Sequence, residues 1–350
     1  MKKRFLLTIV TLLLMSTLAL FTLIGCNNIE DDDVEEYVTL RYVSDGTELI
    51  GYLASGEAEY GVLGEPAATR ANAKTGSTTI FSIQELWNGA TNTTGGFPQA
   101  SVFVNSSILN GSHDAFIDWF IAKLEESATW VSANGADASA ALESAGSVAL
   151  KGINNAMIQK SNIQIIRAEA AKNSVHTYLS VLNSFDPQTI GGSVPNDAFY
   201  ASVSNTNDAN NSEENTIINV CVPDGSPAIA IAKLLKDKPT YDGYTINYEI
   251  VTGANGIGPR LVSGQATIAI APTNAGATQY NKNNGKYKLV ATAVQGALYM
   301  VGKGELSGDT IQEQLNSLKG KTIYNIGQGA TPDLTLRYIL DYYNIPYRIS

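Results

Sequence analysis

Short apolar runs alternate with segments of helical periodicity along most of the chain. Such runs, rich in Val, Ile and aromatic residues, are typical of strands. They cover residues 38–43, 60–63, 79–83, 100–104, 220–222, 248–251, 267–271, 287–291, 297–301 and 321–325. Helices are predicted between several of them, for example over residues 46–53 and 67–73. Because strands that alternate with helices usually form parallel sheets, the pattern predicts an α/β protein.

Two stretches depart from this alternation. Residues 112–185 have helical periodicity throughout, and we expect a helical segment whose apolar stripe, which includes Phe116 and Phe120, packs in the core. Residues 204–216 are polar and of low complexity, which is typical of a linker.

A short pattern, Leu-x-Ser-Gly-x-Ala, occurs at residues 53–58 and again at residues 261–266. In each copy a helix is predicted to end at the Ser-Gly pair, an apolar run follows, and a loop with a proline closes the unit. The polar loop residues Glu65 and Thr273 follow the two glycines by nine positions in both copies. The repeat therefore predicts two similar α/β lobes, each with a polar loop at the carboxyl end of a strand, where open α/β sheets bind ligands.

The N-terminus has the features of an export signal. Three basic residues, 2–4, precede an apolar run over residues 5–24, and Gly25 precedes Cys26. This order predicts a secretory signal peptide. Leu-Ile-Gly-Cys resembles a bacterial lipobox, which implies cleavage before Cys26 and lipid attachment to its thiol. The alternative is an uncleaved transmembrane anchor, because about 20 apolar residues can span a bilayer. Both interpretations place the rest of the chain outside the cytoplasm, behind an acidic tether at residues 26–37.

Charge and reactive residues exclude several classes of function. The formal net charge of -10 and the low content of Lys and Arg argue against a nucleic-acid surface. His113 and His176 are the only histidines, and they lack metal-ligand spacing. If Cys26 carries lipid, Cys221 is the single remaining thiol, and its strand-like surroundings predict a buried core residue. We therefore expect no metal, no cofactor and no catalytic residues.

Several motifs together resemble a known family. Residues 224–230, 271–275, 298–302, 318–323 and 327–333 resemble the first half of a solute-binding protein of ABC importers, of the group that binds nitrate, sulfonates, taurine and thiamine precursors. Residues 64–66, 85–87, 97–100 and 190–200 resemble the second half. The two halves stand in reversed order, so the chain resembles a circular permutant, whether natural or engineered. Permutation is tolerated where chain ends lie close together at the surface.

The resemblance implies a two-lobed α/β fold of the periplasmic-binding-protein-like type II, circularly permuted, with the helical segment in the larger lobe. The expected parts are a signal peptide (1–25), the tether (26–37), a smaller lobe (38–78 and 304–350), a larger lobe (79–203 and 217–303) and the linker (204–216). The strand at 38–43 should then share a sheet with the strand at 321–325, and Ser350 should end near Tyr37.

The candidate ligand-binding residues lie at strand ends and helix starts. Ser226 and Thr331 each precede a proline at a predicted helix start, which suits either side-chain capping or an anion site built from helix N-termini. Glu65, Thr273 and Asn274 stand at strand ends, where turn formation is the alternative explanation. With second-rank candidates included, the set is Ser226, Pro227, Thr273, Asn274, Gln295, Tyr299, Gln328, Ala330, Thr331, Glu65, Trp87 and Gln99. Core packing is the default expectation for Tyr299 and Trp87.

The resemblance implies that the protein captures a small organic or anionic solute and delivers it to an ABC permease, as a monomer anchored by lipid on the outer face of the cytoplasmic membrane or in the periplasm. A binding module that senses a ligand for a membrane signalling partner is the alternative. An exported enzyme is a third hypothesis. Residues 252–258 resemble the nucleotide loop of short-chain dehydrogenases but are one residue short of its spacing, and no nucleophile elbow or Ser/His/Asp arrangement occurs.

Overall fold

The computed structural model describes residues 37–203 and 215–350, apart from the side chains of residues 253–255. The predicted signal peptide, nearly all of the tether, Cys26 and most of the linker lie outside this part. Within it, none of the helices is both long enough and apolar enough to cross a membrane.

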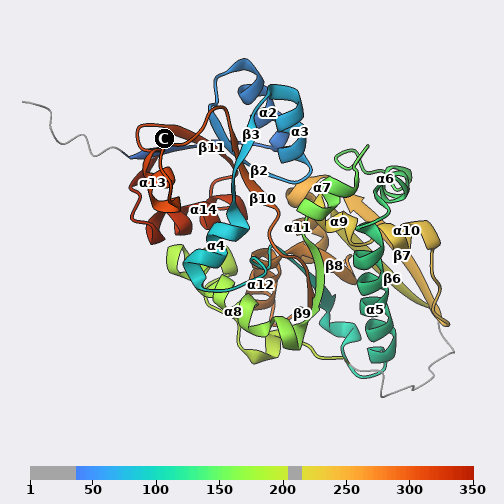
Figure 1. The fold of residues 1–350 in the computed structure, drawn as a ribbon. Helices are drawn as coiled ribbons and strands as arrows, with labels where there is room; N and C mark the ends of the chain where they lie inside the picture. Colours follow the sequence, from blue (N-terminus) through green and yellow to red (C-terminus); the bar gives the residue numbers. More distant parts are fainter. Residues whose placement is uncertain (1–36, 204–214) are drawn as a thin grey trace, which may run out of the picture. The chain divides into compact units, whose positions relative to one another are not determined.

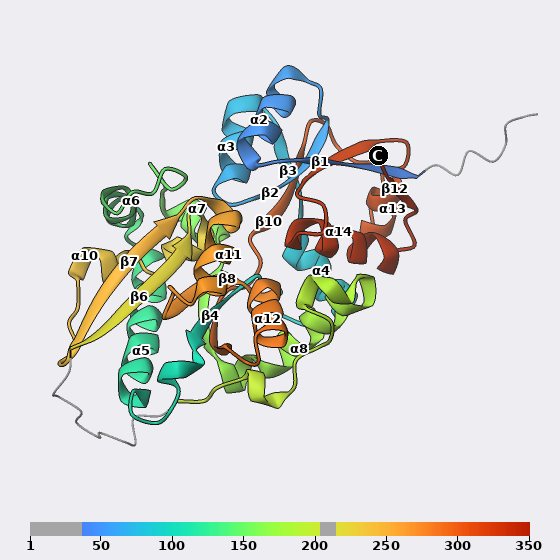
Figure 2. The same cartoon turned by 180° about the vertical axis from the view of Figure 1, so that it is seen from behind.

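Two mixed six-stranded sheets form the framework (Figures 1 and 2). In order across the first sheet, sheet A, the strands are β12 (Tyr347–Ile349), β1 (Val38–Val43), β11 (Thr322–Ile326), β2 (Tyr60–Gly64), β10 (Leu298–Gly302) and β3 (Thr78–Ser82). Across sheet B they are β5 (Ile163–Arg167), β9 (Tyr287–Val294), β4 (Ala100–Asn105), β8 (Ile268–Pro272), β6 (Thr216–Pro223) and β7 (Tyr244–Val251). The α/β class is as predicted, but the sheets are not purely parallel. The chain passes between the sheets twice, from β3 to β4 and from β9 to β10. Strand β4 runs antiparallel to β8, and β10 runs antiparallel to β2.

The helices surround these sheets. They are α2 (Gly46–Ser55), α3 (Ala67–Thr75), α4 (Ile83–Thr91), α5 (Asp114–Val131), α6 (Gly135–Ser144), α7 (Asn155–Lys160), α8 (Ala168–Phe185), α9 (Ser226–Ile229), α10 (Ala232–Asp237), α11 (Gly253–Ser263), α12 (Thr273–Lys282), α13 (Ile311–Asn316) and α14 (Thr331–Tyr342). The prediction of an uninterrupted helical segment over 112–185 is wrong, because Ile163–Arg167 forms β5. This run is rich in β-branched residues and pairs with β9, so an available sheet edge outweighs the helical neighbours.

The predicted pairing of residues 38–43 with residues 321–325 is present. Strand β1 runs parallel to β11, with Leu40 opposite Ile323. Strand β12 pairs with the other side of β1, and the Ser350 N–H donates to the Leu40 carbonyl at 3.1 Å. The Arg348 guanidinium lies 4.0 Å from the centre of the Tyr37 ring. The neighbour of Ser350 on β1 is therefore Leu40, three residues after the predicted neighbour, Tyr37.

The strands at the expected lobe boundaries lie in sheet A. Strand β10 pairs antiparallel with both β2 and β3, so residues 79–82 and 298–302 are part of the sheet that contains β1 and β11. The expected lobe boundaries put residues 79–82 and 298–302 in the larger lobe. Their strands, β3 and β10, are hydrogen-bonded within sheet A and are not part of sheet B. Sequence motifs do not reveal which sheet these two strands join, because the partner of a strand depends on where the chain turns after it.

The repeated unit has the same local structure twice. Helices α2 and α11 end at Gly56 (φ 83°) and Gly264 (φ 80°), in the left-handed region that favours glycine. Strands β2 and β8 follow, each between one parallel and one antiparallel neighbour, and α3 and α12 come next. The repeat therefore places Glu65 and Thr273 directly after equivalent strands.

Alternating side chains of sheet A face two helical layers. Leu63 and Val301 pack with α2 and α3, whereas Val62 and Met300 pack with the layer that contains α4 and α14. This second cluster continues to Phe103 of sheet B, so one apolar core connects a face of each sheet. The opposite face of sheet B packs on α5, α6 and α10, where the predicted stripe of Phe116, Phe120 and Leu124 is buried.

Candidate functional site

Four of the candidate residues belong to one network of hydrogen bonds between the sheets. The Ser226 hydroxyl, after β6, donates to the Glu65 carbonyl, after β2, at 2.9 Å. The Glu65 N–H donates to the Ala297 carbonyl at 2.9 Å, and the Ala297 N–H donates to Gln99 Oε1 at 2.8 Å. The Gln99 carbonyl accepts the Thr273 N–H at 3.2 Å. The ends of β2, β6 and β8 and the start of β4 are therefore joined through the two connections between the sheets. We call this set the strand-end network.

Glu65 carries a buried carboxylate within this network. Only 5% of the residue is exposed, although charged loop residues are usually solvated. Its Oε1 accepts the Thr69 hydroxyl at 2.7 Å, and the Thr69 N–H lies 3.4 Å from Oε2. Burial raises the pKa of this carboxyl, against the opposing effects of Thr69, Lys160 and Arg70. Both carboxylate oxygens can accept further hydrogen bonds.

We expect Glu65→Gln to raise the melting temperature at neutral pH. Because the folded-state pKa of Glu65 is raised, the folded protein keeps this proton to a higher pH than the unfolded chain does, and stability falls as pH rises through the folded pKa. Glutamine keeps an oxygen for the Thr69 hydroxyl and has no charge to bury. Melting temperatures measured from the ordinary glutamate range to pH 8 should show the difference between variant and parent closing as pH falls. The exposed Glu57 provides the control, and a pH profile of Glu65→Gln identical to that of Glu57→Gln would contradict the prediction.

Ser226 and Thr331 stand at helix starts, but neither caps its helix with a side chain. Gly225 and Ala330 are the N-cap residues of α9 and α14, so Ser226 and Thr331 are the first helical residues, and each is followed by its proline. The Ser226 hydroxyl is used by the strand-end network. The Thr331 hydroxyl accepts a hydrogen bond from the buried Tyr178 hydroxyl at 3.2 Å. The expectation of capping is therefore wrong, because a residue inside the first turn directs its side chain away from the free N–H groups.

A buried aspartate, which the sequence analysis did not single out, organises the loop before α14. Asp333 has no exposed surface; its Oδ1 accepts the Tyr42 hydroxyl at 2.7 Å and its Oδ2 accepts the Gly329 N–H at 2.8 Å. The Arg337 guanidinium lies 3.6 Å from Oδ2. Burial, followed by the hydrogen bond to Asp333, raises the pKa of the Tyr42 hydroxyl. The signal available in the sequence is an acidic residue in the first helical turn, directly after the Thr-Pro pair. Gln328, in the same loop, is exposed.

Asn274 leaves an acceptor unused at the start of α12. Its amide nitrogen donates to the Thr189 carbonyl at 3.4 Å, whereas its Oδ1 is buried and has no hydrogen-bond partner among the described residues. Thr273 beside it is fully buried and shares a hydrogen bond of 2.8 Å with the Ser101 hydroxyl. A buried polar atom without a partner is uncommon in native proteins and calls for an explanation.

The second-rank candidates near β10 serve internal contacts. The Tyr299 hydroxyl donates to the Lys160 carbonyl at 2.9 Å, and burial, followed by the charge of Glu65, raises its pKa to about 12. The Gln295 amide donates to the Thr292 hydroxyl at 2.6 Å. Trp87 is 2% exposed and packs against Phe97, Tyr178 and Tyr338, with ring centres 5.5, 5.7 and 5.1 Å away. Trp87 is therefore a core residue, as the default expectation has it.

A loop between α6 and α7 is held from both sheets. Arg70, on α3, donates to the carbonyls of Ala149 and Lys151. Asp224, after β6, accepts the Ser147 hydroxyl and, at 2.9 Å, the Ala149 N–H. Arg70 lies five positions after Glu65 and Asp224 two positions before Ser226, so these charge-assisted contacts are close in sequence to members of the strand-end network. The sequence motifs do not indicate the contacts.

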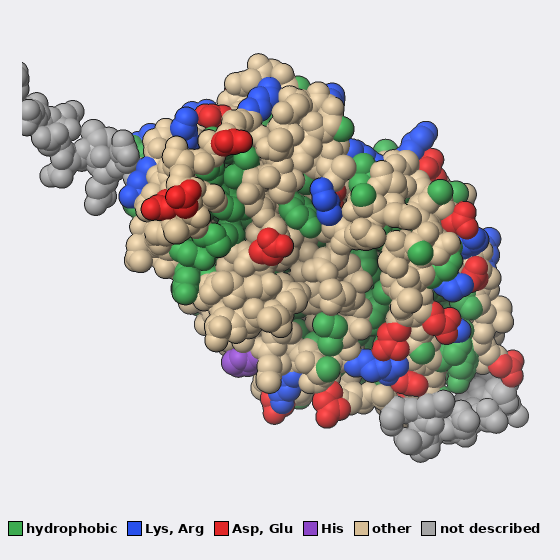
Figure 3. Space-filling view, viewed as in Figure 1, with side chains coloured by type: hydrophobic (Ala, Val, Ile, Leu, Met, Phe, Trp, Pro, Cys, Tyr) green, Lys and Arg blue, Asp and Glu red, His purple; other side chains and the backbone are tan. Residues whose placement is uncertain are grey.

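The surface and the reactive side chains place further limits on function. Basic and acidic side chains are interspersed over the face seen in Figure 3. Among the described residues, no group of three or more His, Cys, Asp or Glu could hold a metal ion. Cys221 is buried in β6, as predicted; burial, then its hydrogen bond to Glu249, raises the pKa of its thiol to about 12.

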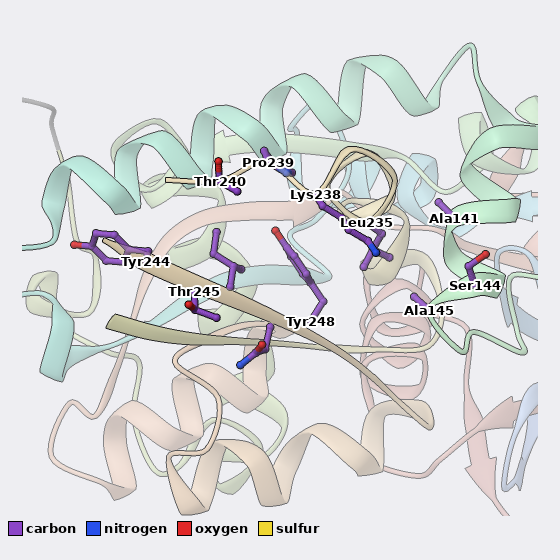
Figure 4. A pocket seen from close by; sticks show the side chains of 12 residues that line it. Ala141, Ser144, Ala145, Leu235, Lys238, Pro239, Thr240, Tyr244, Thr245 and Tyr248 are labelled. Atoms are coloured by element: carbon purple, nitrogen blue, oxygen red, sulfur yellow. The ribbon is translucent and has the colours of Figure 1, made fainter. Parts of the chain in front are cut away.

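A pocket lies elsewhere, away from the strand-end network. Its volume is about 640 Å³, and it is found between α6, α10 and β7 (Figure 4). None of its lining residues belongs to the predicted set. Pro227 and Ala330 are half-buried at the starts of α9 and α14.

The candidate residues thus form two groups. Asn274 keeps an unused acceptor and Glu65 a buried carboxylate near the junction of the sheets, whereas Trp87, Gln295 and Thr331 are engaged in internal contacts. No family model matches the chain, and no curated protein or solved structure matches it.

Proposed function

We propose that this chain is an extracytoplasmic, lipid-anchored solute-binding protein that captures a small solute between two α/β lobes and delivers it to an ABC importer. The observation that carries the proposal is the strand-end network, in which polar residues following equivalent strands of two sheets meet. Ligands of open α/β sheets bind outside the carboxyl ends of the strands. Closure of two lobes around a ligand is a common mode of action for such proteins.

A circularly permuted type II fold accounts for the strand order of sheet A. Strand β1 is the first strand along the described part of the chain, and it lies between β11 and β12, the last two strands. Chain segments that are neighbours in a sheet can exchange order along the sequence without losing their contacts, which is the condition that permutation requires.

The buried acceptors near the junction of the sheets favour a solute with hydrogen-bond donors. The Glu65 carboxylate is buried and accepts only from Thr69, and Asn274 Oδ1 is buried with no partner among the described residues. A buried acceptor that stays unpaired costs about 1–3 kcal/mol, so a solute that donates N–H or O–H groups there gains affinity over one that cannot. We therefore propose a small organic solute with amine, amide or hydroxyl donors.

A thermal-shift screen tests the proposal. Sulfonates, nitrate, pyrimidines and compounds that resemble amino acids are added to the full chain, and a solute that binds only the folded form stabilises it by about 2.7 kcal/mol at 100 times its Kd. For a hit, Asn274→Ala should weaken binding about tenfold, because the loss of an acceptor in a buried site costs about 1–3 kcal/mol. Calorimetric titration gives the Kd.

Asn283→Ala is the matched control, since Asn283 is an exposed asparagine at the end of the same helix region. The proposed site is wrong if a solute binds with the same Kd to the parent, Asn274→Ala and Glu65→Gln. The proposed function is wrong if none of these solute classes shifts the melting temperature.

We expect Cys26→Ser to move the protein from the membrane fraction to the soluble fraction and to abolish incorporation of a labelled fatty acid. The reason is that Cys26 is the proposed attachment point, and without acyl chains no stable anchor remains. Cys221→Ser is the control, because Cys221 is buried and should not affect acylation. Retention of Cys26→Ser in the membrane fraction would instead support an uncleaved anchor.

A further inference from the structure

The pocket between α6, α10 and β7 has features of a second binding site. Strand β7 is at the edge of sheet B, and the ends of α6 and α10 lie beside it. Its volume of about 640 Å³ falls within the range of about 300–1,000 Å³ that is usual for small-molecule pockets. The residues that line it include Leu235, Lys238, Tyr244, Ile246 and Tyr248. None of them takes part in the strand-end network, so this site does not depend on the proposed function.

One wall of the pocket is apolar and held in place. Tyr244, Ile246 and Tyr248 alternate along β7, so their side chains share one face of the strand, and all three pack against the core cluster under α5 and α10. The Tyr244 ring is stacked on Phe116 with ring centres 4.2 Å apart, and its hydroxyl is hydrogen-bonded to His113 Nδ1 at 2.8 Å. Rigid aromatic walls of this kind bind flat or branched apolar groups with little loss of side-chain freedom.

Two hydrogen-bond donors at the pocket lack acceptors. Lys238 ends α10 in the left-handed region (φ 48°), where its N–H donates to the Leu234 carbonyl and Pro239 follows, so its backbone is fixed. Its ammonium has no ion pair or hydrogen bond among the described residues, since the neighbouring Asp237 pairs with Lys233.

The second donor is the Tyr248 hydroxyl. It is buried and without a partner in the described part of the chain. Burial raises its pKa, so it remains protonated and able to donate at neutral pH. Figure 4 shows the Lys238 and Tyr248 side chains on the α10 side of β7, within the same pocket. Lys238 is the only charged residue among those that line it.

We propose that this pocket binds a small organic carboxylate with an aromatic or branched apolar body. Lys238 and Tyr248 donate to the carboxylate, while the faces of Tyr244, Ile246 and Leu235 contact the body. One ammonium and one hydroxyl match a single negative charge, and hydrogen bonds between an ammonium and a carboxylate are stronger than neutral ones. A neutral amide of the same shape can accept with its carbonyl oxygen, but it lacks the negative charge that strengthens the hydrogen bond from the ammonium.

Titration of the protein with phenylacetate tests this site, with phenylacetamide as the neutral molecule of matched shape. Calorimetry or ligand-observed NMR should show binding of phenylacetate and at least tenfold weaker binding of phenylacetamide. Lys238→Gln should weaken phenylacetate about tenfold and Tyr248→Phe about threefold, in keeping with charged and neutral hydrogen bonds respectively. Lys303→Gln, a change at an exposed lysine outside the pocket, and Glu65→Gln should leave the Kd unchanged.

Several outcomes would overturn the proposal. These are no binding of phenylacetate at millimolar concentration, equal affinity for phenylacetamide, or a Kd that Lys238→Gln or Tyr248→Phe leaves unchanged. Loss of binding in Glu65→Gln would place the probe at the strand-end network instead. The unfolding midpoint of Lys238→Gln should equal that of the parent, because Lys238 is exposed, and that of Tyr248→Phe should not fall, because the buried Tyr248 hydroxyl has no partner to lose.

Discussion

Replacing Trp87 with alanine should lower the free energy of unfolding by about 3–5 kcal/mol, the usual cost of removing a large aromatic side chain from a core. Trp87 connects segments that are distant in sequence. Its ring contacts Phe97 before β4, Tyr178 on α8 and Tyr338 on α14. Surrounding side chains on three elements cannot all move to fill the space, so a cavity remains. Chemical denaturation of parent and variant measures the loss.

Trp130→Ala is the matched control. Trp130 is partly buried and its ring faces the ammonium groups of Lys233 and Lys236 at 5.7 and 5.1 Å, so the expected loss is about 1 kcal/mol. If Trp87→Ala kept the stability of the parent and lost affinity for the solute, Trp87 would belong to a ligand surface and its assignment to the core would be wrong.

Asp333→Ala should lower the free energy of unfolding by about 3 kcal/mol. The change leaves the Tyr42 hydroxyl and the Gly329 N–H without their acceptor, and each buried group that loses its partner costs about 1–3 kcal/mol. It also leaves Arg337 beside a site with no negative charge. Because Gly329 belongs to the loop before α14, we expect hydrogen exchange at residues 327–331 to increase as well.

The same helix offers a control for this prediction. Asp341 is exposed, and the contact of its carboxylate with the Tyr347 hydroxyl, at 3.5 Å, is long. Asp341→Ala should therefore change stability by about 0.5 kcal/mol or less. Similar losses for the two variants would mean that the buried contacts of Asp333 do not hold the loop.

Local sequence was sufficient for most individual elements. The Ser-Gly pairs predict the ends of α2 and α11 because glycine adopts the left-handed conformation at little cost, and apolar runs predict β2 and β8. Strand β5 was missed, since five residues between helices form a strand only when an edge such as β9 is there to pair with them. Strands β3 and β10 were found as strands, but their pairing with each other and with β2 in sheet A was not predictable from local sequence.

For the candidate site, sequence indicated positions more reliably than roles. Glu65, Thr273 and Gln99 were selected as polar residues near strand ends or loops and Ser226 as a residue at a helix start, and the four do lie in one network. Their contacts were not predictable, because a hydroxyl in a first helical turn can cap, bind a ligand or reach another element. Asp333 and Arg70 were overlooked because their partners are 291 and 79 residues away along the chain.

The sequence by itself determined the α/β class, the repeated helix, strand and loop unit, and the helix ends, because each depends on propensities and patterns within about ten residues. Only the tertiary structure decided which strands share a sheet, which carboxylates are buried and which donors near β7 lack an acceptor. These properties depend on pairing and desolvation between segments that are far apart in sequence, and the free energy of a buried polar group is set by the partners that the fold brings to it.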